Sequence, residues 1–213
     1  MNQTTELREL VLLKLDKLLF SQEYKRLKRT HSWKRKITSE QTFLIHLNIG
    51  MNENLETLTI IPSVSIRSEW LTNCQVECGM IDAKYAKDNA HFGKRLTQLK
   101  HIPYYFFTVE NKPKKIARIL FKDIEELGLP LLNEISDYNF VSELLLSGNP
   151  QEWVVDSRSH RARYLPLLLI LLNRKTEAFK VLEVMNKDIK GKDQLIPSFD
   201  YFKAWFTDKF EII

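Results

Sequence analysis

The chain has 213 residues, of which 44% are hydrophobic and 28% are charged, and its formal net charge is +5. These values are ordinary for a soluble globular protein, and a chain of this length buries roughly 70% of its unfolded surface, so folding requires neither a disulfide nor a metal. No apolar run reaches the about 18 residues of a transmembrane helix, so we expect no membrane partner. The first residues lack the basic start and apolar core of a signal peptide, and the two cysteines, Cys74 and Cys78, fit a reducing compartment. We therefore expect a cytoplasmic protein.

One short stretch holds most of the positive charge. Between Lys25 and Lys36 the chain carries seven cations and no acid, so this stretch has a charge of +7 and the remainder has −2, the difference between +5 and +7. The protein is thus a mildly acidic molecule with one basic segment, whereas proteins that coat nucleic acid usually spread their charge more widely. The cations of this basic segment are Lys25, Arg26, Lys28, Arg29, Lys34, Arg35 and Lys36.

The chain begins with a predicted helix, from about Thr5 to Tyr24, in which leucines recur at helical spacing. The second part of the basic segment, His31–Ile37, alternates as a strand does. In this strand, Trp33 and Ile37 are expected to face the core, and Lys34 and Lys36 to face solvent.

The stretch Gln41–Arg67 alternates between apolar and polar residues on both sides of a turn at Asn52–Asn54. This alternation predicts a β-hairpin with one apolar face, which fixes the register of its two strands. We expect Ile49 to pair with Leu58, and we expect Pro62, which lacks an N–H donor, to mark an edge strand or a bulge. The residues predicted to be buried beneath the helices of the C-terminal half are Phe43, Ile45, Leu47 and Ile49.

The pattern becomes helical in the second half of the chain. Tyr104–Val109 predicts one more strand, because aromatic and branched residues follow one another there. Lys112–Leu127 predicts a helix that Gly128 and Pro130 end. Further helices are predicted over Ser136–Leu146, His160–Leu172, Lys175–Lys187 and Ser198–Lys209.

This segregation of strands and helices favours an α+β fold over alternating α/β. We expect a mostly antiparallel sheet built from the N-terminal half, residues 1–110, together with the first helix. It would pack against the helices of the C-terminal half, residues 111–213, as one continuous domain.

Familiar catalytic and cofactor motifs are absent from the sequence. The six glycines lie too far apart for a phosphate-cradling loop, and neither a nucleophile elbow nor a zinc-protease motif occurs. Cys74 and Cys78 have no further ligands nearby, so we expect two buried thiols and no metal. His46 could act as a base, but a surface histidine is the simpler interpretation. We therefore predict no catalytic residue and no cofactor.

One loose pattern would fit a metal-dependent nuclease. Asp82-Ala83-Lys84 has the acid-x-lysine spacing that such enzymes place on a strand, and Glu77 offers a second acid. In such a site the acids hold a divalent ion and the lysine stabilises the attacking hydroxide. The neighbouring alanines favour the start of a solvated helix instead, so a nuclease is the third alternative.

The basic segment is the strongest local anomaly, and two interpretations of it stay open. Its cations, with Trp33 available for stacking, would suit contacts to a nucleic acid or to an acidic protein. Alternatively, its outward charges guard a solvated sheet edge against pairing. A second group of cations, which could lie near the basic segment or far from it, consists of Arg158, Arg161 and Arg163.

Four stretches, PSVSIRSEWL, YYFFTVE, ELGLPLL and YLPLLLILLNRKTEAFKVLE, follow one another in the chain. In this order the sequence resembles a bacterial family of small α+β proteins that is catalogued only as a domain of unknown function, over most of residues 5–190. The family has no established active site, and some members resemble immunity or accessory proteins beside toxin genes. The resemblance therefore implies a non-enzymatic intracellular protein that binds another protein, in the sharpest version a cognate toxin. The alternative is a nucleic-acid-binding module that uses the basic segment.

Overall fold

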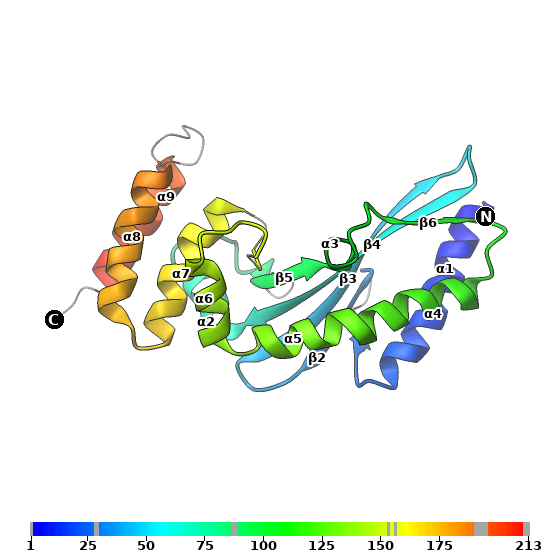
Figure 1. Cartoon of the computed structure of the whole chain (residues 1–213), viewed down its shortest axis with the longest axis horizontal. Helices are drawn as coiled ribbons and strands as arrows, with labels where there is room; N and C mark the ends of the chain where they lie inside the picture. Colours follow the sequence, from blue (N-terminus) through cyan, green and yellow to red (C-terminus); the bar gives the residue numbers. More distant parts are fainter. Residues whose placement is uncertain are drawn as a thin grey trace. The chain divides into compact units, whose positions relative to one another are not determined.

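Figure 1 shows the computed structural model of the chain, which describes residues 2–27, 30–86, 89–152, 154–155, 157–189 and 196–210. The fold is α+β, as predicted, with an antiparallel sheet from the N-terminal half and helices mostly in the C-terminal half. The chain forms two compact units, each made of two segments. The sheet unit comprises Met1–Ile66 and Gly93–Glu134, and the helical unit comprises Arg67–Phe92 and Ile135–Ile213. Each helix in the described part of the chain is too short or too polar to span a bilayer.

The sheet follows the order β1-β2-β3-β4-β5, and β6 also pairs with β4. The pairs β1–β2, β2–β3 and β4–β6 are antiparallel. The long strands β3 and β4 form the predicted hairpin around a turn at residues 53–56. The bounds are Lys25–Arg26 for β1, Ser32–Lys36 for β2, Gln41–Asn52 for β3, Thr57–Ser68 for β4, Phe92–Arg95 for β5 and Tyr105–Thr108 for β6.

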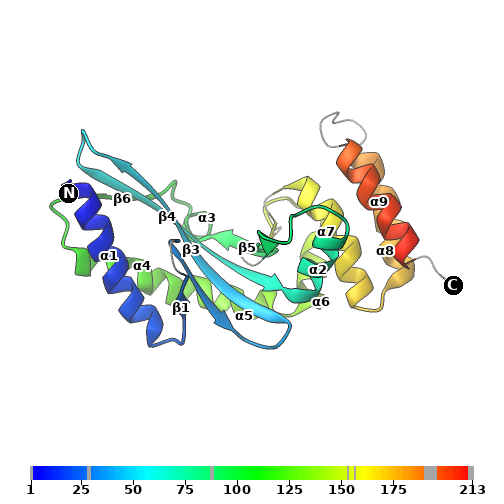
Figure 2. The ribbon, with the colours of Figure 1, turned by 180° about the vertical axis from the view of Figure 1, so that it is seen from behind.

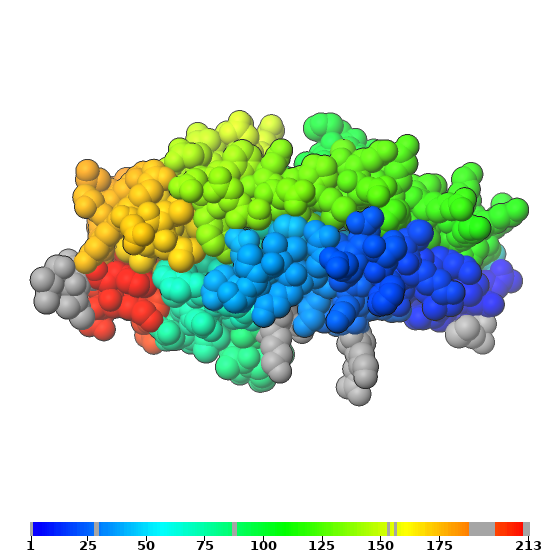
Figure 3. Space-filling view, turned by 90° about the horizontal axis from the view of Figure 1, so that it is seen from below, coloured from blue at the N-terminus to red at the C-terminus, as the bar shows by residue number. Residues whose placement is uncertain are grey.

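Two helices cover one face of this sheet, which we call the inner face (Figures 1 and 2). α1 spans Gln3–Phe20 and α4 spans Pro113–Asp123, and the two helices pack against each other, so their dark blue and green regions adjoin in Figure 3. α1 also lies against β1 and β3 (Figure 2). Both helices present an apolar stripe to the sheet, which is how an amphipathic helix buries its apolar side. The buried residues of these stripes include Leu12 and Leu15 of α1 and Leu120 of α4.

The alternation of β3 places its apolar residues on the inner face. Phe43, Ile45 and Leu47 are buried, as predicted, but beneath α1 of the N-terminal half as well as α4, and Ile49 is half-buried toward the end of the hairpin. Ile37 was expected to face the core, but it is 40% exposed. The reason is that β2 ends at the preceding residue, so the alternation stops before Ile37 can point inward.

The two long strands pair two residues away from the predicted register. The hydroxyl of Thr59 donates to the carbonyl oxygen of Gly50 at 3.3 Å, and a Cβ at Gly50 would lie 4.0 Å from the Cβ of Thr59. Such closeness marks directly opposite residues, so Ile49 lies opposite Ile60 rather than Leu58. A shift of two residues keeps every side chain on its predicted face, because the period of a strand is two.

β4 is an inner strand, so the prediction that Pro62 marks an edge strand is wrong. β6 pairs with Thr57–Ile60 of this strand. Gly93 of β5 approaches Ser65 so closely that a Cβ on it would lie 2.5 Å from the Cβ of Ser65. Pro62 falls between these two partners, where its missing N–H removes no bond to either of them.

The helix predicted over Lys112–Leu127 does not end at Gly128. α4 passes into a π-helical turn, Ile124–Gly128, and then into α5, Leu129–Ile135. A Cβ at Gly128 would lie 2.8 Å from Cγ1 of Val64, so this glycine serves close packing of the helix on the sheet. Pro130 follows this wider turn and lacks the N–H that a regular helix would use. The wider turn changes the hydrogen-bond pattern just before Pro130, so the chain stays helical through α5.

The helical unit contains the predicted antiparallel pair, α7 and α8. The turn between them places Asn173 at a φ of 59°, a left-handed conformation that asparagine tolerates. α9 contributes three buried phenylalanines, Phe199, Phe202 and Phe206. The helices of this unit are α2 Glu69–Glu77, α6 Tyr138–Leu146, α7 Arg158–Leu171, α8 Lys175–Ile189 and α9 Ile196–Phe210, whereas α3 Leu96–Leu99 belongs to the sheet unit.

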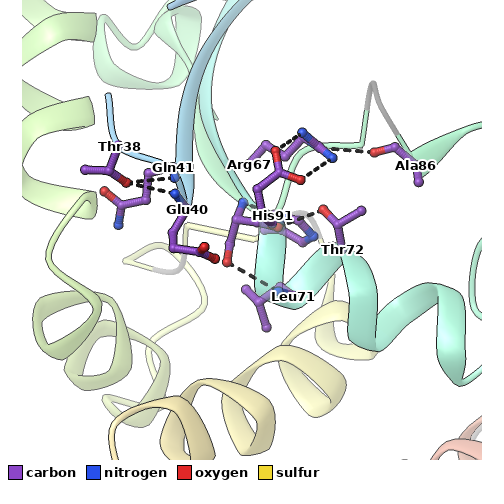
Figure 4. Close-up of polar contacts among 10 residues, drawn as sticks. Thr38, Glu40, Gln41, Arg67, Leu71, Thr72, Ala86 and His91 are labelled. Atoms are coloured by element: carbon purple, nitrogen blue, oxygen red, sulfur yellow. Dashed lines mark hydrogen bonds and ion pairs between the residues drawn. The ribbon is translucent and has the colours of Figure 1, made fainter. Parts of the chain in front are cut away.

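A buried polar network surrounds His91 in the helical unit (Figure 4). The hydroxyl of Ser68 caps α2 by accepting from the N–H of Leu71, and the N–H of Ser68 donates to Nδ1 of His91 at 3.0 Å. With Nδ1 accepting, Nε2 carries the proton and donates to Oε1 of Gln75 at 2.9 Å. Burial, with the nearby charge of Arg67, lowers the pKa of His91 to about 3, so the ring is neutral at pH 7.

The first prediction concerns the inner face. Because Leu47 is fully buried there, Leu47→Ala should lower the free energy of unfolding by about 2–5 kcal/mol in urea denaturation. Asn48→Ala is the matched control, because Asn48 is the next residue and is exposed. It should change the same quantity by less than about 0.5 kcal/mol. Equal effects of the two substitutions would contradict the assignment of the inner face.

The second prediction concerns acid stability. Between about pH 6.5 and the folded pKa of about 3, an unfolded histidine binds a proton that folded His91 does not, so stability falls as the pH falls. At about pH 5 this single group should cost about 2 kcal/mol relative to pH 7. His91→Gln keeps an amide that can donate to Gln75 but does not titrate, so its loss of stability should be smaller by that amount. Denaturation curves at the two pH values test this, and identical pH dependence in both proteins would refute it.

Candidate functional site

The face of the sheet opposite α1 and α4, which we call the outer face, gathers lysines of the basic segment. The register pairs Lys25 with Lys34 and pairs Lys36 with Thr42, and opposite residues point to the same face. Trp33 points inward, so its neighbours on the strand point outward. All three lysines are exposed, as the alternation predicted for Lys34 and Lys36.

These three lysines carry positive charge that no acidic side chain of the described residues neutralises. Lys25 and Lys34 lie directly opposite each other, an arrangement of like charges that is unfavourable on a sheet. Within the part of the chain that the structure describes, neither of them nor Lys36 forms an ion pair. Folding alone does not require this arrangement, which makes it a candidate for function.

Carboxylates are missing from the described outward positions of the strands. Many of these positions hold lysines, hydroxyls, an amide or an imidazole, which can donate hydrogen bonds, and others are apolar. Thr42, Leu44 and Thr57 are buried among them. The outward residues include Lys25, Ser32, Lys34, Lys36, Thr42, Leu44, His46, Asn48, Gly50, Thr57, Thr59, Ile61, Ser63, Ser65, Arg67, Phe106 and Thr108.

His46 lies on the outer face opposite Ser32, and its Nδ1 is 2.7 Å from the hydroxyl oxygen of Ser32. Burial lowers the pKa of His46, and the neighbouring His31 lowers it further. Burial also lowers the pKa of His31, with added effects of Arg8 and Arg26. Both imidazoles are therefore neutral at pH 7, and the lysines supply the positive charge of this face.

The two arginines in the described part of the basic segment point to the inner side of the sheet. The guanidinium of Arg35 lies 5.5 Å from the ring centre of its partner Phe43 and 5.0 Å from that of Tyr24. The guanidinium of Arg26 lies 5.8 Å from the ring of its partner Trp33. Such cation–π contacts stabilise the fold, so these cations are structural rather than part of the outer face.

Trp33 is fully buried, so the prediction that it is available for stacking is wrong. Its Nε1 donates to Oδ1 of Asp16 in α1 at 2.8 Å. The alternation that turns Lys34 outward turns Trp33 inward, and α1 supplies the acceptor that a buried indole needs. Lys28 and Arg29, two further predicted contact residues, lie outside the described residues.

The second predicted group of cations belongs to α7 of the helical unit and does not form one surface. Arg158 is exposed, whereas Nε of Arg161 donates to the carbonyl oxygen of Leu145 at 2.6 Å and so ties α7 to α6. Arg163 is 5% exposed and lines a hollow. With about 3.6 residues per helical turn, the three positions point in different directions.

The residues considered for metal chemistry are not assembled into a site. Cys74 and Cys78 are buried free thiols, as predicted, and burial raises the pKa of both. Asp82 and Lys84 lie in an exposed turn rather than on a strand and pair with each other, while Glu77 forms an ion pair of its own. Among the described residues, no group of three histidine, cysteine or acidic side chains is arranged to hold a metal.

No family model matches the sequence, and no curated protein or solved structure is significantly similar to it. The outer face is therefore interpreted from its own chemistry. It presents three lysines without ion pairs in the described structure, beside hydroxyl groups, on one side of a sheet. Such a surface suits an extended anionic partner better than one small ligand, because its charges lie side by side rather than converging in a cavity.

The third prediction separates structural from functional cations of the basic segment. Arg35→Ala removes a guanidinium held by two aromatic rings and should lower the free energy of unfolding by about 1–2 kcal/mol. Lys34→Thr removes an exposed lysine opposite another lysine, so stability should stay within about 0.5 kcal/mol of wild type or rise slightly. Thermal and urea denaturation of both variants test this. A larger loss for Lys34→Thr than for Arg35→Ala would contradict it.

Proposed function

We propose that this chain is an intracellular binding protein whose outer face docks an acidic surface of another protein. The observation that carries the proposal is the row of Lys25, Lys34 and Lys36, which face the same way without an ion pair in the described structure and without a carboxylate beside them on the described strands. An acidic partner would relieve the repulsion between the opposite lysines. It would also steer its own association by complementary charge.

Two observations favour a protein over a nucleic acid as the partner. Proteins that bind single strands combine a basic groove with exposed aromatic rings on which bases stack. Tyr24 and Trp33, the aromatic residues next to these lysines in the sequence, are both fully buried. Phe106 is an exposed ring on the outer face, but it lies on β6, beyond β4 and away from β2. The hydroxyl and amide groups that lie between these lysines and Phe106 on the outer face suit the polar rim of a protein interface.

The resemblance to a family with immunity-like members suggests which protein to test. Under that hypothesis the partner is a toxin encoded beside this chain, and binding neutralises it. Under the same hypothesis, the basic outer face suits a toxin that presents an acidic surface, because opposite charges steer association. The nucleic-acid-binding module remains the second candidate, and it is an outcome of the same experiment.

The fourth prediction tests the outer face by charge removal. A variant carrying Lys25→Ser, Lys34→Ser and Lys36→Ser should bind the product of the adjacent gene at least about tenfold more weakly than wild type, mainly through slower association. The control variant carries Lys112→Ser, Lys114→Ser and Lys115→Ser, which removes the same charge from exposed positions near the start of α4. It should bind within about twofold of wild type. Biolayer interferometry gives both rate constants.

The same variants are measured with a random single-stranded and a random double-stranded oligonucleotide. Binding that falls with salt at a slope of roughly −0.7 to −0.9 per phosphate contact, and that only the outer-face variant loses, would replace the protein partner with a nucleic acid. If wild type and the outer-face variant bind the adjacent gene product equally well, the outer face is only a solvated surface and the proposal is wrong.

A further inference from the structure

The helical unit contains a hollow that neither the basic segment nor the outer face involves. Its volume of about 370 Å³ falls at the small end of the roughly 300–1,000 Å³ typical of ligand pockets. Its described lining holds a guanidinium, an imidazole, two hydroxyls and a thiol, but no carboxylate. The lining residues are Cys78, Gly79, Met80, Ser159, His160, Arg163 and Tyr201.

One wall of the hollow is the end of α2, whose backbone conformation is fixed by two hydrogen bonds. The N–H of Met80 donates to the carbonyl oxygen of Gln75, and the N–H of Gly79 donates to that of Val76. These two bonds form a Schellman cap, which needs a left-handed residue, and Gly79 has a φ of 67°. The cap therefore places Cys78 and Met80 at the hollow without using any lining side chain.

The beginning of α7 forms another part of the lining. Ser157 caps this helix by accepting from the N–H of His160. The side chains of Ser159, His160 and Arg163 then line the hollow from the first two turns of α7.

Arg163 brings the strongest charge to the hollow from a buried position. It is 5% exposed, and its Nη1 donates to the carbonyl oxygen of Ser159 at 3.1 Å as well as to the hydroxyl of Ser159. Its guanidinium also lies 5.7 Å from the ring centre of Phe199. A buried guanidinium interacts with a nearby anion more strongly than an exposed one, because water screens the pair less.

From this geometry we propose that the hollow binds the carboxylate or phosphate group of a small organic anion. Arg163 meets the anionic oxygens, and the hydroxyl of Ser159 and the imidazole of His160 donate further hydrogen bonds from the first turn of α7. Tyr201, which is 62% exposed, contacts the organic part at the mouth of the hollow. The volume exceeds what a single inorganic anion needs, which is the reason to expect an organic substituent.

The fifth prediction uses three probes in a buffer that contains neither phosphate nor carboxylate: inorganic phosphate, succinate and phenyl phosphate. Isothermal titration calorimetry should detect saturable binding of at least one of them to the full chain. Tighter binding of the two phosphates than of succinate assigns a phosphate ester, and the reverse order assigns a carboxylate. Absence of saturable binding for all three would overturn the proposal.

Matched substitutions on α7 locate the bound anion. Arg163→Gln should weaken binding at least about tenfold. Arg158→Gln removes the same charge from an exposed position of the same helix outside the hollow and should change binding less than about twofold. If circular dichroism shows that Arg163→Gln does not fold, the double variant Ser159→Ala with His160→Gln replaces it and should weaken binding at least about fivefold. Unchanged affinity in the folded variant would overturn the assignment to this hollow, whatever the outcome at the outer face.

Discussion

The burial of the inner face of the hairpin is the constraint on which the sheet unit depends. Phe43, Ile45 and Leu47 all point toward α1 and α4. Because successive side chains of a strand point to opposite faces, the residues between them must point to the outer face. Residues that pair across neighbouring strands point to the same face, so the alternation of β3 also fixes that of β2 and β1. Trp33 therefore points inward and Lys34 points outward. The basic outer face is therefore positioned by the hydrophobic core, and a register slip of one residue would bury its lysines.

This coupling divides the basic segment into two kinds of cation. Arg35 and Arg26 point to the same side of the sheet as Trp33. Their guanidinium groups lie against aromatic rings there, an arrangement that suits arginine well. Lysines occupy the outward positions, where a flexible, strongly hydrated ammonium suits contact with a partner surface. The count of seven cations in the sequence therefore overstates the charge that any partner meets, because two described members of the segment are committed to the fold.

The sequence predicted what depends on local pattern and missed what depends on distant contacts. Alternation alone assigns the faces of Lys34 and Trp33, and turn residues predict the α7–α8 hairpin at Asn173. Pro62 suggested an edge strand because nothing local reveals that β5 and β6 meet β4 on either side of it. The alternation indicates that Trp33 faces the core, but its hydrogen bond to Asp16 depends on how α1 packs against the sheet. The hollow of the helical unit escapes prediction because α2, α7 and α9 each contribute to it from separate parts of the chain.

The two proposed sites present charge in opposite ways, which leads to different behaviour. The lysines of the outer face are exposed, so each contributes little to affinity and much to the rate of encounter, and salt at physiological concentration screens them beyond about 8 Å. Arg163 is buried, so most of its water is removed when the chain folds. An anion that binds it would therefore meet a preorganised donor, and less free energy would be lost in removing water from the protein. Binding at the outer face should therefore respond strongly to ionic strength, whereas binding in the hollow should respond weakly to ionic strength and strongly to the shape of the anion. On the two proposals together, the outer face would select a large partner by charge and the hollow a small anion by fit, and the two surfaces belong to different units of the chain.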